Sequence, residues 1–428
     1  MDWSNLFSSH GTNCRRCNIA PPNYMRILYI SKRLNARDGS SVHGREFVKA
    51  LSSLGHDVIP YPGIDNSNPP ARSNRNLGER RKLRVKKLPA KFMKGLKARN
   101  RYIRDIINLW VGFFESRSQV KEIYTLLKDV EPELIVYRAM LYDFIPNILR
   151  KNSNAPIIAE VNSIKSIEMD MGAKINSTWL SLWAEEYSLK PADAITVVSA
   201  PIKKYLESTP LTKPVVVVEN GVNLENFQPD ADTKQTLKNK YGINGKITIG
   251  YIGSYKRWHG LADTLKVAHK LINDGLPVHF VLIGSGEDEL NIQRLIDKLA
   301  LESHVTRIPN LPHEQIAKHV NLIDVALMTY PAMEFFYFSP LKMYEYLAAG
   351  IPIVSSRLGQ IETTLENLSF GSLVTPGDVN GFAEAIKPLV LDTHHRHLVS
   401  EEARQWAVDN CSWTKNASTV LSVQAELR

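Results

Sequence analysis

Cysteine is scarce in this chain. Only three of the 428 residues are cysteines, Cys14, Cys17 and Cys411. Three thiols cannot build the disulfide framework that stabilises many secreted domains. With 43% hydrophobic residues, the chain can instead fill the cores of two or three globular domains. We therefore expect a globular protein of a reducing compartment, the cytoplasm.

Long apolar runs are also missing. A membrane-spanning helix needs about 20 consecutive apolar residues, and the longest candidate, Ile106–Phe114, is interrupted by Asn108 and Gly112. The first 24 residues lack the continuous apolar stretch of a secretory signal. The sequence therefore predicts neither a transmembrane protein nor a secreted one.

Acidic residues are nearly absent from one basic segment. The net charge is +9, but between Arg72 and Arg104 there are 14 lysines or arginines and one acid, Glu79. An aromatic stretch containing Trp110 follows, and this combination is typical of a contact with an anionic membrane. We expect that contact through residues 72–114, at the inner face of the membrane. The alternative is a solvated insertion whose apolar end is a core helix; nucleic acid is not expected as a partner, because no nucleic-acid motif accompanies the basic run.

From Met25 onward, short runs rich in Ile and Val alternate with stretches of helical period. This alternation predicts an α/β fold with two doubly wound, Rossmann-like domains. The expected strands of the first half are Arg26–Ser31, Asp57–Pro60, Leu134–Tyr137, Pro156–Val161 and Ala194–Val198. Those of the second half are Ile247–Ile252, Val278–Ile283, Val305–Ile308, Val325–Met328 and Pro352–Ser355.

A turn-rich segment after Val218 interrupts the alternation and marks a domain boundary. The predicted parts are a disordered tail (1–24), an N-terminal domain (25–210) with a basic insertion (64–117), a C-terminal domain (211–405) and a terminal segment (406–428). Doubly wound sheets bind ligands at the carboxyl ends of their strands. We therefore expect the site in a cleft between the two domains.

Two glycine-containing junctions follow predicted strands and open helices. Gly39 and Ser40 follow the first strand, and Gly284-Ser-Gly286 follows Val278–Ile283. Backbone N–H groups at such a junction can face a phosphate, whereas a plain tight turn is the alternative. A third glycine of a dinucleotide fingerprint is absent after Gly286, so a nicotinamide cofactor is not expected.

Basic side chains follow the strand Ile247–Ile252 in the second half. Lys256 and Arg257 there would suit a diphosphate leaving group, unless they are merely solvated. Farther on, Lys342 and Glu345 lie three residues apart on one face of a predicted helix. They offer a cation and a carboxylate to one ligand, or to each other as an ion pair.

The order and spacing of these motifs resemble the family-4 glycosyltransferases of the GT-B fold. In the second half the resemblance is carried by Val218–Pro229, Gly253–Gly260, Ser339–Val354, Gly359–Ile361 and Pro376–Asp378. In the first half it is looser, through Gly39–His43, Leu54–Val58, Pro156–Asn162 and Ala192–Ser199. The resemblance implies two domains facing across a cleft, with the C-terminal helix crossing back to the first.

The resemblance also implies a function. A sugar would pass, with retention of configuration, from a nucleotide sugar held by the C-terminal domain to a glycan or lipid-linked acceptor held by the N-terminal domain. Glu345 matches the family's second motif glutamate, which is expected to hold the ribose hydroxyls, and Lys342, Lys256 and Arg257 are candidates for the diphosphate. No metal or other cofactor is expected. The further donor-binding candidates are Gly39, Ser40, Gly253, Ser254, His259, Gly284, Gly286, Ser339 and Leu341.

The chain departs from the family pattern at several positions. The first motif glutamate falls on Tyr337, with Glu334 as the nearest acid, and both are catalytic candidates. The usual phosphate-loop cations fall on Ser254 and His259. On the acceptor side Glu160-Val-Asn162 replaces the usual histidine, and His43 is a further candidate there. The alternatives in function are a non-catalytic glycan- or lipid-binding GT-B protein and a GT-B sugar-nucleotide epimerase.

Overall fold

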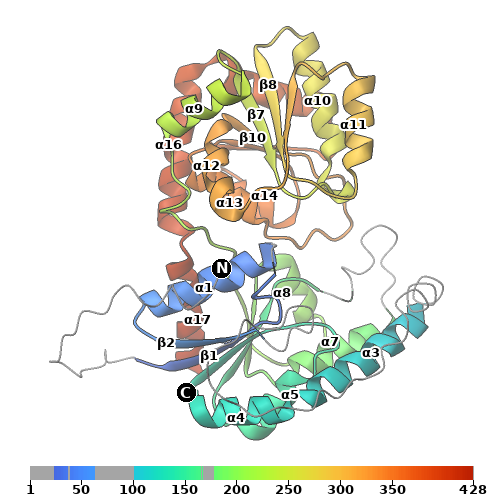
Figure 1. Ribbon diagram of the computed structural model, residues 1–428, viewed down its shortest axis with the longest axis vertical. Coiled ribbons are helices and arrows are strands. Elements are labelled where there is room, and N and C mark those ends of the chain that lie inside the picture. Colours follow the sequence, from blue (N-terminus) through green and yellow to red (C-terminus); the bar gives the residue numbers. More distant parts are fainter. Residues whose placement is uncertain (1–23, 37–38, 63–100, 165, 167–177, 428) are drawn as a thin grey trace, which may run out of the picture. The chain divides into compact units, whose positions relative to one another are not determined.

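The fold is that of a computed structural model (Figure 1). It describes residues 24–36, 39–62, 101–164, 166 and 178–427. The predicted tail, except Tyr24, lies outside the described residues, and so do the basic insertion before residue 101 and the side chain of Ser40.

Two six-stranded parallel sheets form the framework. Their strand orders are β2-β1-β3-β4-β5-β6 and β12-β11-β10-β7-β8-β9, so the predicted α/β class with two Rossmann-like sheets is confirmed. The strands of the first sheet are β1 (Arg26–Ile30), β2 (Asp57–Tyr61), β3 (Leu134–Arg138), β4 (Ile157–Val161), β5 (Ala194–Val197) and β6 (Val215–Val217). Those of the second are β7 (Ile247–Ile252), β8 (Val278–Ile283), β9 (Val305–Ile308), β10 (Val325–Met328), β11 (Ile353–Ser356) and β12 (Gly371–Val374).

Helices connect the strands. Those of the first part of the chain are α1 (Gly39–Ser53), α3 (Arg101–Ser118), α4 (Val120–Val130), α5 (Ile145–Asn152), α7 (Trp179–Leu189) and α8 (Ala200–Glu207). Those that follow are α9 (Ala231–Tyr241), α10 (Leu261–Asn273), α11 (Glu289–Lys298), α12 (His313–His319), α13 (Leu341–Ala348), α14 (Gly359–Leu365), α15 (Val379–Leu391), α16 (Thr393–Asn410) and α17 (Trp413–Glu426). Short 3-10 turns are η2 (Arg257–His259) and η3 (Val320–Leu322).

The described residues fall into two compact units. The first lies within residues 1–160 and 176–193, and the second within 161–175 and 194–428. In the second unit, every side chain of β8 is buried, as expected for a central parallel strand covered on both faces. A single apolar cluster built on β7, β8, β10 and β11 forms its core.

In each sheet the strand order reverses next to the strand that comes first in the chain. β1 lies between β2 and β3, and β7 lies between β10 and β8. Chain connections leave such a strand in opposite directions, which opens a crevice at the carboxyl ends of the strands where ligands of doubly wound sheets bind. The polar groups at the ends of β1 with β3, and of β7 with β10, therefore define the candidate site.

The stretch Ile106–Phe114 lies within α3. The alternative that it is a core helix is wrong, because Trp110 and Phe114 are more than half exposed. Among the described residues, every helix is too short or too polar to cross a bilayer.

Candidate functional site

The most unusual group of the second unit is the amine of Lys342. Its Nζ atom is buried and has no hydrogen-bond partner within the described residues, although the residue as a whole is only half-buried. The amine lies 4.0 Å from the ring centroid of Tyr251, on β7, and 5.9 Å from that of Tyr330, which follows β10. It therefore lies at the carboxyl ends of the two strands between which the strand order reverses.

The amine is held in an environment that disfavours its own charge. Burial lowers the pKa of Lys342 to about 7, against an opposing effect of the Glu345 carboxylate. The two ring faces offer a cation–π attraction, but they supply no hydrogen-bond acceptor for the three N–H donors of an ammonium group. A ligand that brings anionic oxygens would supply what the protein leaves missing.

Gly253 gives this amine its space. Its φ is +145°, and a Cβ there would lie 2.7 Å from Lys342 Nζ and 3.0 Å from the Tyr251 hydroxyl. Gly284 has a similar role between two loops, because a Cβ there would lie 2.0 Å from the Gly253 carbonyl oxygen. The glycines after β7 and β8 thus allow the two loops to touch and leave room beside Lys342.

His259 faces the same region as a neutral ring. Burial, with a smaller contribution from the Lys342 charge, lowers its pKa to about 3. Its Nδ1 lies 2.6 Å from the Ser254 carbonyl oxygen, so Nδ1 carries the hydrogen and donates it. The remaining nitrogen, Nε2, is then an acceptor. His259 therefore does not add positive charge to the site.

The two predicted loop cations already have anionic partners. Lys256 Nζ lies 3.2 Å from a Glu287 carboxylate oxygen, and Arg257 Nε lies 3.7 Å from one of Asp288. The Arg257 side chain is 80% exposed, a setting in which ion pairs are weak and easily exchanged. A diphosphate would have to compete with these carboxylates, whereas Lys342 has no such competitor among the described residues.

Glu345 lies one helical turn after Lys342 on α13. It is 8% exposed, and its Oε1 lies 2.9 Å from His313 Nε2. The His313 ring packs on Phe227 with a centroid distance of 5.3 Å. His313 was not predicted as a site residue. It lies shortly after β9, at the start of α12, and polar residues that follow the carboxyl end of a parallel strand are candidates for ligand binding.

A buried polar network fixes the start of α13. Ser339 Oγ lies 2.9 Å from the Tyr344 hydroxyl, which donates to Glu219 Oε2 at 2.8 Å. Gln360 Nε2 donates to the other Glu219 oxygen, and Asn220 Nδ2 donates to the Ser339 carbonyl. Burial raises the pKa of Glu219. These contacts join Val218–Pro229, Ser339–Val354 and Gly359–Ile361, three segments that were linked in the sequence only through the resemblance to the family.

The other predicted residues of this region differ in setting. Tyr337 is fully buried and packs on Phe338 with ring centroids 4.5 Å apart, while its carbonyl accepts from Ser199. Glu334 is exposed on the loop before it, and Leu341, half-buried, is the first residue of α13. Gly286 packs directly against the backbone of Tyr255, because a Cβ on Gly286 would lie 2.5 Å from the Tyr255 carbonyl oxygen.

In the first unit, Glu160 gathers a polar cluster at the ends of β1, β3 and β4. Its carboxylate lies 3.0 Å from His43 Nε2 and 3.5 Å from an Arg138 nitrogen, and it accepts from the Tyr29 hydroxyl at 3.1 Å. Burial alone would raise the pKa of Glu160, but the charges of His43 and Arg138 and the hydrogen bonds lower it to about 2. Asn162 directly follows β4 and is half-buried.

Gly39 is exposed as the first residue of α1, just after residues 37–38, which lie outside the described part. Asp230, of the sequence Asp230-Ala-Asp232, caps α9 by accepting from Thr233 N at 2.9 Å. Within the described ranges no cluster of three or more His, Cys, Asp or Glu side chains is arranged to hold a metal.

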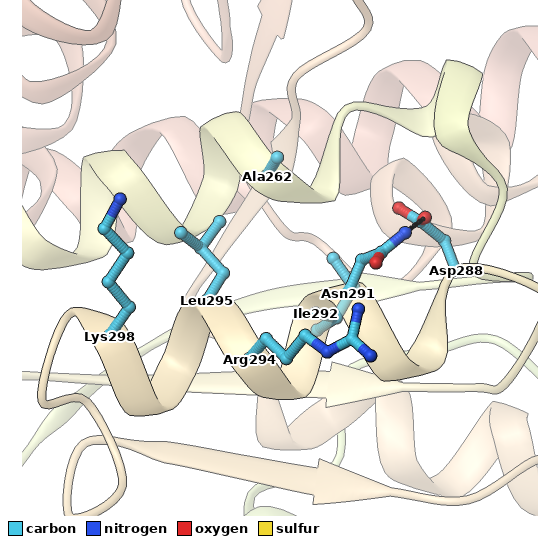
Figure 2. Close-up of a pocket in the computed structure, with 7 residues that line it drawn as sticks. All are labelled: Ala262, Asp288, Asn291, Ile292, Arg294, Leu295 and Lys298. Atoms are coloured by element: carbon cyan, nitrogen blue, oxygen red, sulfur yellow. Dashed lines mark hydrogen bonds between the residues drawn. The ribbon is translucent and has the colours of Figure 1, made fainter.

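A shallow pocket elsewhere does not belong to this site. It has a volume of about 240 Å³ and lies between α10 and α11, with Ile292 and Leu295 in its wall (Figure 2). Asp288 and Asn291 close one end through a 2.7 Å hydrogen bond. Neither Lys342 nor Glu345 lines it.

Comparison with known proteins identifies the family. Residues 37–226 match the model described as Glycosyltransferase Family 4, and residues 233–406 match the model described as Glycosyl transferases group 1. The chain belongs to the family-4 glycosyltransferases of the GT-B fold. The family predicted from the motifs is thereby confirmed.

One curated relative of this glycosyltransferase is a GDP-mannose-dependent alpha-(1-6)-phosphatidylinositol monomannoside mannosyltransferase of Mycolicibacterium smegmatis. It is 24% identical over 246 residues, which are 55% of this chain and 64% of the relative. The matched region thus spans less than two thirds of that relative's length.

Solved structures show the same fold. A sucrose-phosphate synthase from Thermosynechococcus elongatus superposes with a TM-score of 0.71 at 18% identity, over 94% of this chain and 98% of that one. The Anabaena protein HepE, in complex with UDP-glucose, gives a TM-score of 0.67 at 15% identity, over 94% and 100%. At these identities the likeness concerns the fold.

Proposed function

We propose that this glycosyltransferase transfers a sugar, with retention of configuration, from a nucleoside diphosphate sugar to a glycan or lipid-linked acceptor. The observation that carries the proposal is the buried amine of Lys342, unpaired within the described residues, at the ends of β7 and β10. The diphosphate of the donor would give this amine its missing acceptors. The first turn of α13, which contains no acidic residue, would add a favourable dipole.

Glu345 is proposed to hold the ribose of the donor. A carboxylate can accept hydrogen bonds from two hydroxyls, and the contact with His313 Nε2 at 2.9 Å orients it. The structure of HepE is a complex with UDP-glucose, and the Mycolicibacterium relative is a GDP-mannose-dependent mannosyltransferase. Both proteins favour a nucleotide sugar as the donor of this chain, and they leave the identity of the base open.

The chemistry proposed needs little from the protein beyond position and charge. The bond between the sugar's anomeric carbon and the diphosphate oxygen breaks, and the acceptor oxygen bonds to the same face of that carbon. The acceptor's proton passes to the departing diphosphate oxygen. Lys342 neutralises the charge that develops on the diphosphate, assisted by Lys256 and Arg257, and we propose that no metal is required.

The acceptor is proposed to bind through the first unit, at the cluster of Tyr29, His43, Arg138 and Glu160. These groups lie at the carboxyl ends of β1, β3 and β4, and they suit the hydroxyls of a sugar. We propose a role in polysaccharide biosynthesis on the cytoplasmic side of a membrane, with residues 72–114 contacting the anionic surface.

A donor panel tests the proposal. UDP-, GDP-, ADP- and dTDP-sugars are incubated with the full chain, with and without a mixture of glycan acceptors, and the released nucleoside diphosphate is measured. We expect release from one donor class, increased by an acceptor, with the anomeric configuration retained in the product. Conversion of the donor to an epimer without acceptor would indicate the epimerase instead, and binding without turnover would indicate a non-catalytic protein.

A further inference from the structure

Helix α3 buries small and polar residues and exposes its large apolar ones. A surface helix normally buries its apolar face, but the buried residues of α3 include Asp105, Gly112 and Ser116. Its large apolar side chains point outward, with Trp110 57% and Phe114 53% exposed. Exposing this much apolar surface to water is unfavourable. A contiguous exposed apolar face of this kind marks a site of interaction with a protein or a membrane.

Specific contacts hold α3 in this orientation. Asp105 accepts a hydrogen bond from Thr178 Oγ1, the cap of α7. A Cβ on Gly112 would lie 2.0 Å from the Tyr142 carbonyl oxygen, so the helix backbone lies directly against that residue. Rotating α3 to bury Trp110 would break the first contact and move a larger residue into the second. The outward position of the aromatic side chains is therefore built into the unit.

Helix α7 extends the same surface. Trp179 is 67% and Trp183 43% exposed, and α7 contacts α3 (Figure 1). The rings form a continuous path, from Phe113 to Phe144 at 5.9 Å, to Tyr187 at 5.6 Å and to Trp183 at 5.1 Å. We call this surface the aromatic face, made of Ile103, Ile106, Trp110, Val111, Phe113, Phe114, Trp179, Leu182 and Trp183.

The charge of the sequence that leads into α3 favours one kind of partner. Between Arg72 and Arg104, which lies in the first turn of α3, there are 14 basic residues and one acid, and Arg117 lies in the last turn. A second copy docked on this face would carry the same basic sequence, and the like charges disfavour that pairing. An anionic lipid surface attracts them. Tryptophan prefers the headgroup depth, and three of the chain's seven tryptophans lie here.

We propose that the aromatic face of α3 and α7 inserts into the headgroup region of an anionic membrane, with the tryptophans as its anchors. The sequence predicts a membrane contact through residues 72–114, which include Trp110 and the two phenylalanines. The structure adds α7, with Trp179 and Trp183, to that contact. This proposal concerns the first unit and does not depend on the chemistry of the donor site.

Vesicle flotation of the full chain tests the proposal. Vesicles of phosphatidylglycerol and phosphatidylcholine are compared with vesicles of phosphatidylcholine alone. The variants are Trp110→Ser/Phe114→Ser on α3 and Trp179→Ser/Trp183→Ser on α7. A matched control is Leu290→Ser/Leu391→Ser, two leucines that are 73% and 69% exposed in the second unit. We expect each face variant to lower the partition coefficient on anionic vesicles about tenfold or more, and the control to change it less than twofold.

A second readout uses the wild-type chain and does not depend on any variant folding. Lipids brominated near the headgroup should quench part of its tryptophan fluorescence. The proposal is overturned if wild type shows no quenching, or if the face variants float as well as the control. It is also overturned if sedimentation without lipid shows a dimer that these variants dissociate, because the aromatic face would then be an interface between copies.

Discussion

Replacing Lys342 with methionine is expected to lower kcat/KM for the nucleotide sugar about 10³-fold, or about 4 kcal/mol of transition-state stabilisation. Methionine keeps most of the side-chain volume against Tyr251 and Tyr330 but removes the charge that we propose faces the diphosphate. Steady-state kinetics with the preferred donor measure the effect. Because the methionine occupies a buried position without a charge to desolvate, the variant should unfold at the same temperature or higher.

Lys256→Met and Arg257→Met serve as matched controls. Both residues are basic and lie on the neighbouring loop, but each is paired with a carboxylate. We expect each to lower kcat/KM less than about tenfold. Losses of equal size at all three positions would mean that the burial of Lys342 has no special part in the site, which contradicts our account.

Replacing Glu345 with glutamine is expected to raise KM for the natural donor about 10- to 100-fold, as for the loss of a hydrogen bond to a charged group. The amide has one acceptor oxygen where the carboxylate has two. With a 2′,3′-dideoxyribose donor the same substitution should change KM less than threefold, because both hydroxyls that Glu345 would hold are absent. Comparing the KM values of the four combinations of enzyme and donor isolates the contact between Glu345 and the ribose hydroxyls.

His313 offers the control for Glu345. It contacts the carboxylate but is not proposed to touch the donor, so His313→Phe should raise KM only a few-fold with either donor. If Glu345→Gln raised KM for the dideoxyribose donor as much as for the ribose donor, Glu345 would support the site without holding the ribose hydroxyls.

Much of the fold could be predicted from the sequence. The runs Ile247–Ile252, Val278–Ile283, Val305–Ile308 and Val325–Met328 are strands with the predicted bounds. Three of them, β7, β8 and β10, are short, apolar and almost wholly buried, which is the clearest strand signal a parallel sheet provides. The fourth, β9, is an edge strand in which only Ile308 is buried. Strand β12, Gly371–Val374, was missed, because glycine and serine begin it and only Val374 is buried.

The sequence left the orientation of α3 open between a membrane contact and a core helix, because its pattern does not show which face of a helix is buried. The apolar residues of a helix are ordinarily assigned to the core. The structure exposes them, since Asp105 and Gly112 make contacts that only they can make. Local periodicity cannot contain this information, which depends on Thr178 and Tyr142, residues distant in the sequence.

For the candidate site, the sequence predicted Lys342 and Glu345 on one helical turn but not their surroundings. The ring of Tyr251, the space left by Gly253 and the contact with His313 come from strands far apart in the chain. These surroundings distinguish a buried amine from an ordinary surface lysine. The resemblance to the family selected Lys342 and Glu345 as candidates. The packing around them supplies the chemical reason why they could bind a ligand.

Proton uptake on donor binding, measured by titration calorimetry at pH 8 in buffers of different ionisation enthalpy, tests the central claim most directly. With a pKa of about 7, the free amine of Lys342 is mostly uncharged at pH 8. A diphosphate that binds it would raise its pKa, so affinity should fall as pH rises above 7 and be steady below it. We predict an uptake of about 0.9 proton per donor by wild type and none by Lys342→Met; binding without uptake, equal in both, would contradict the account.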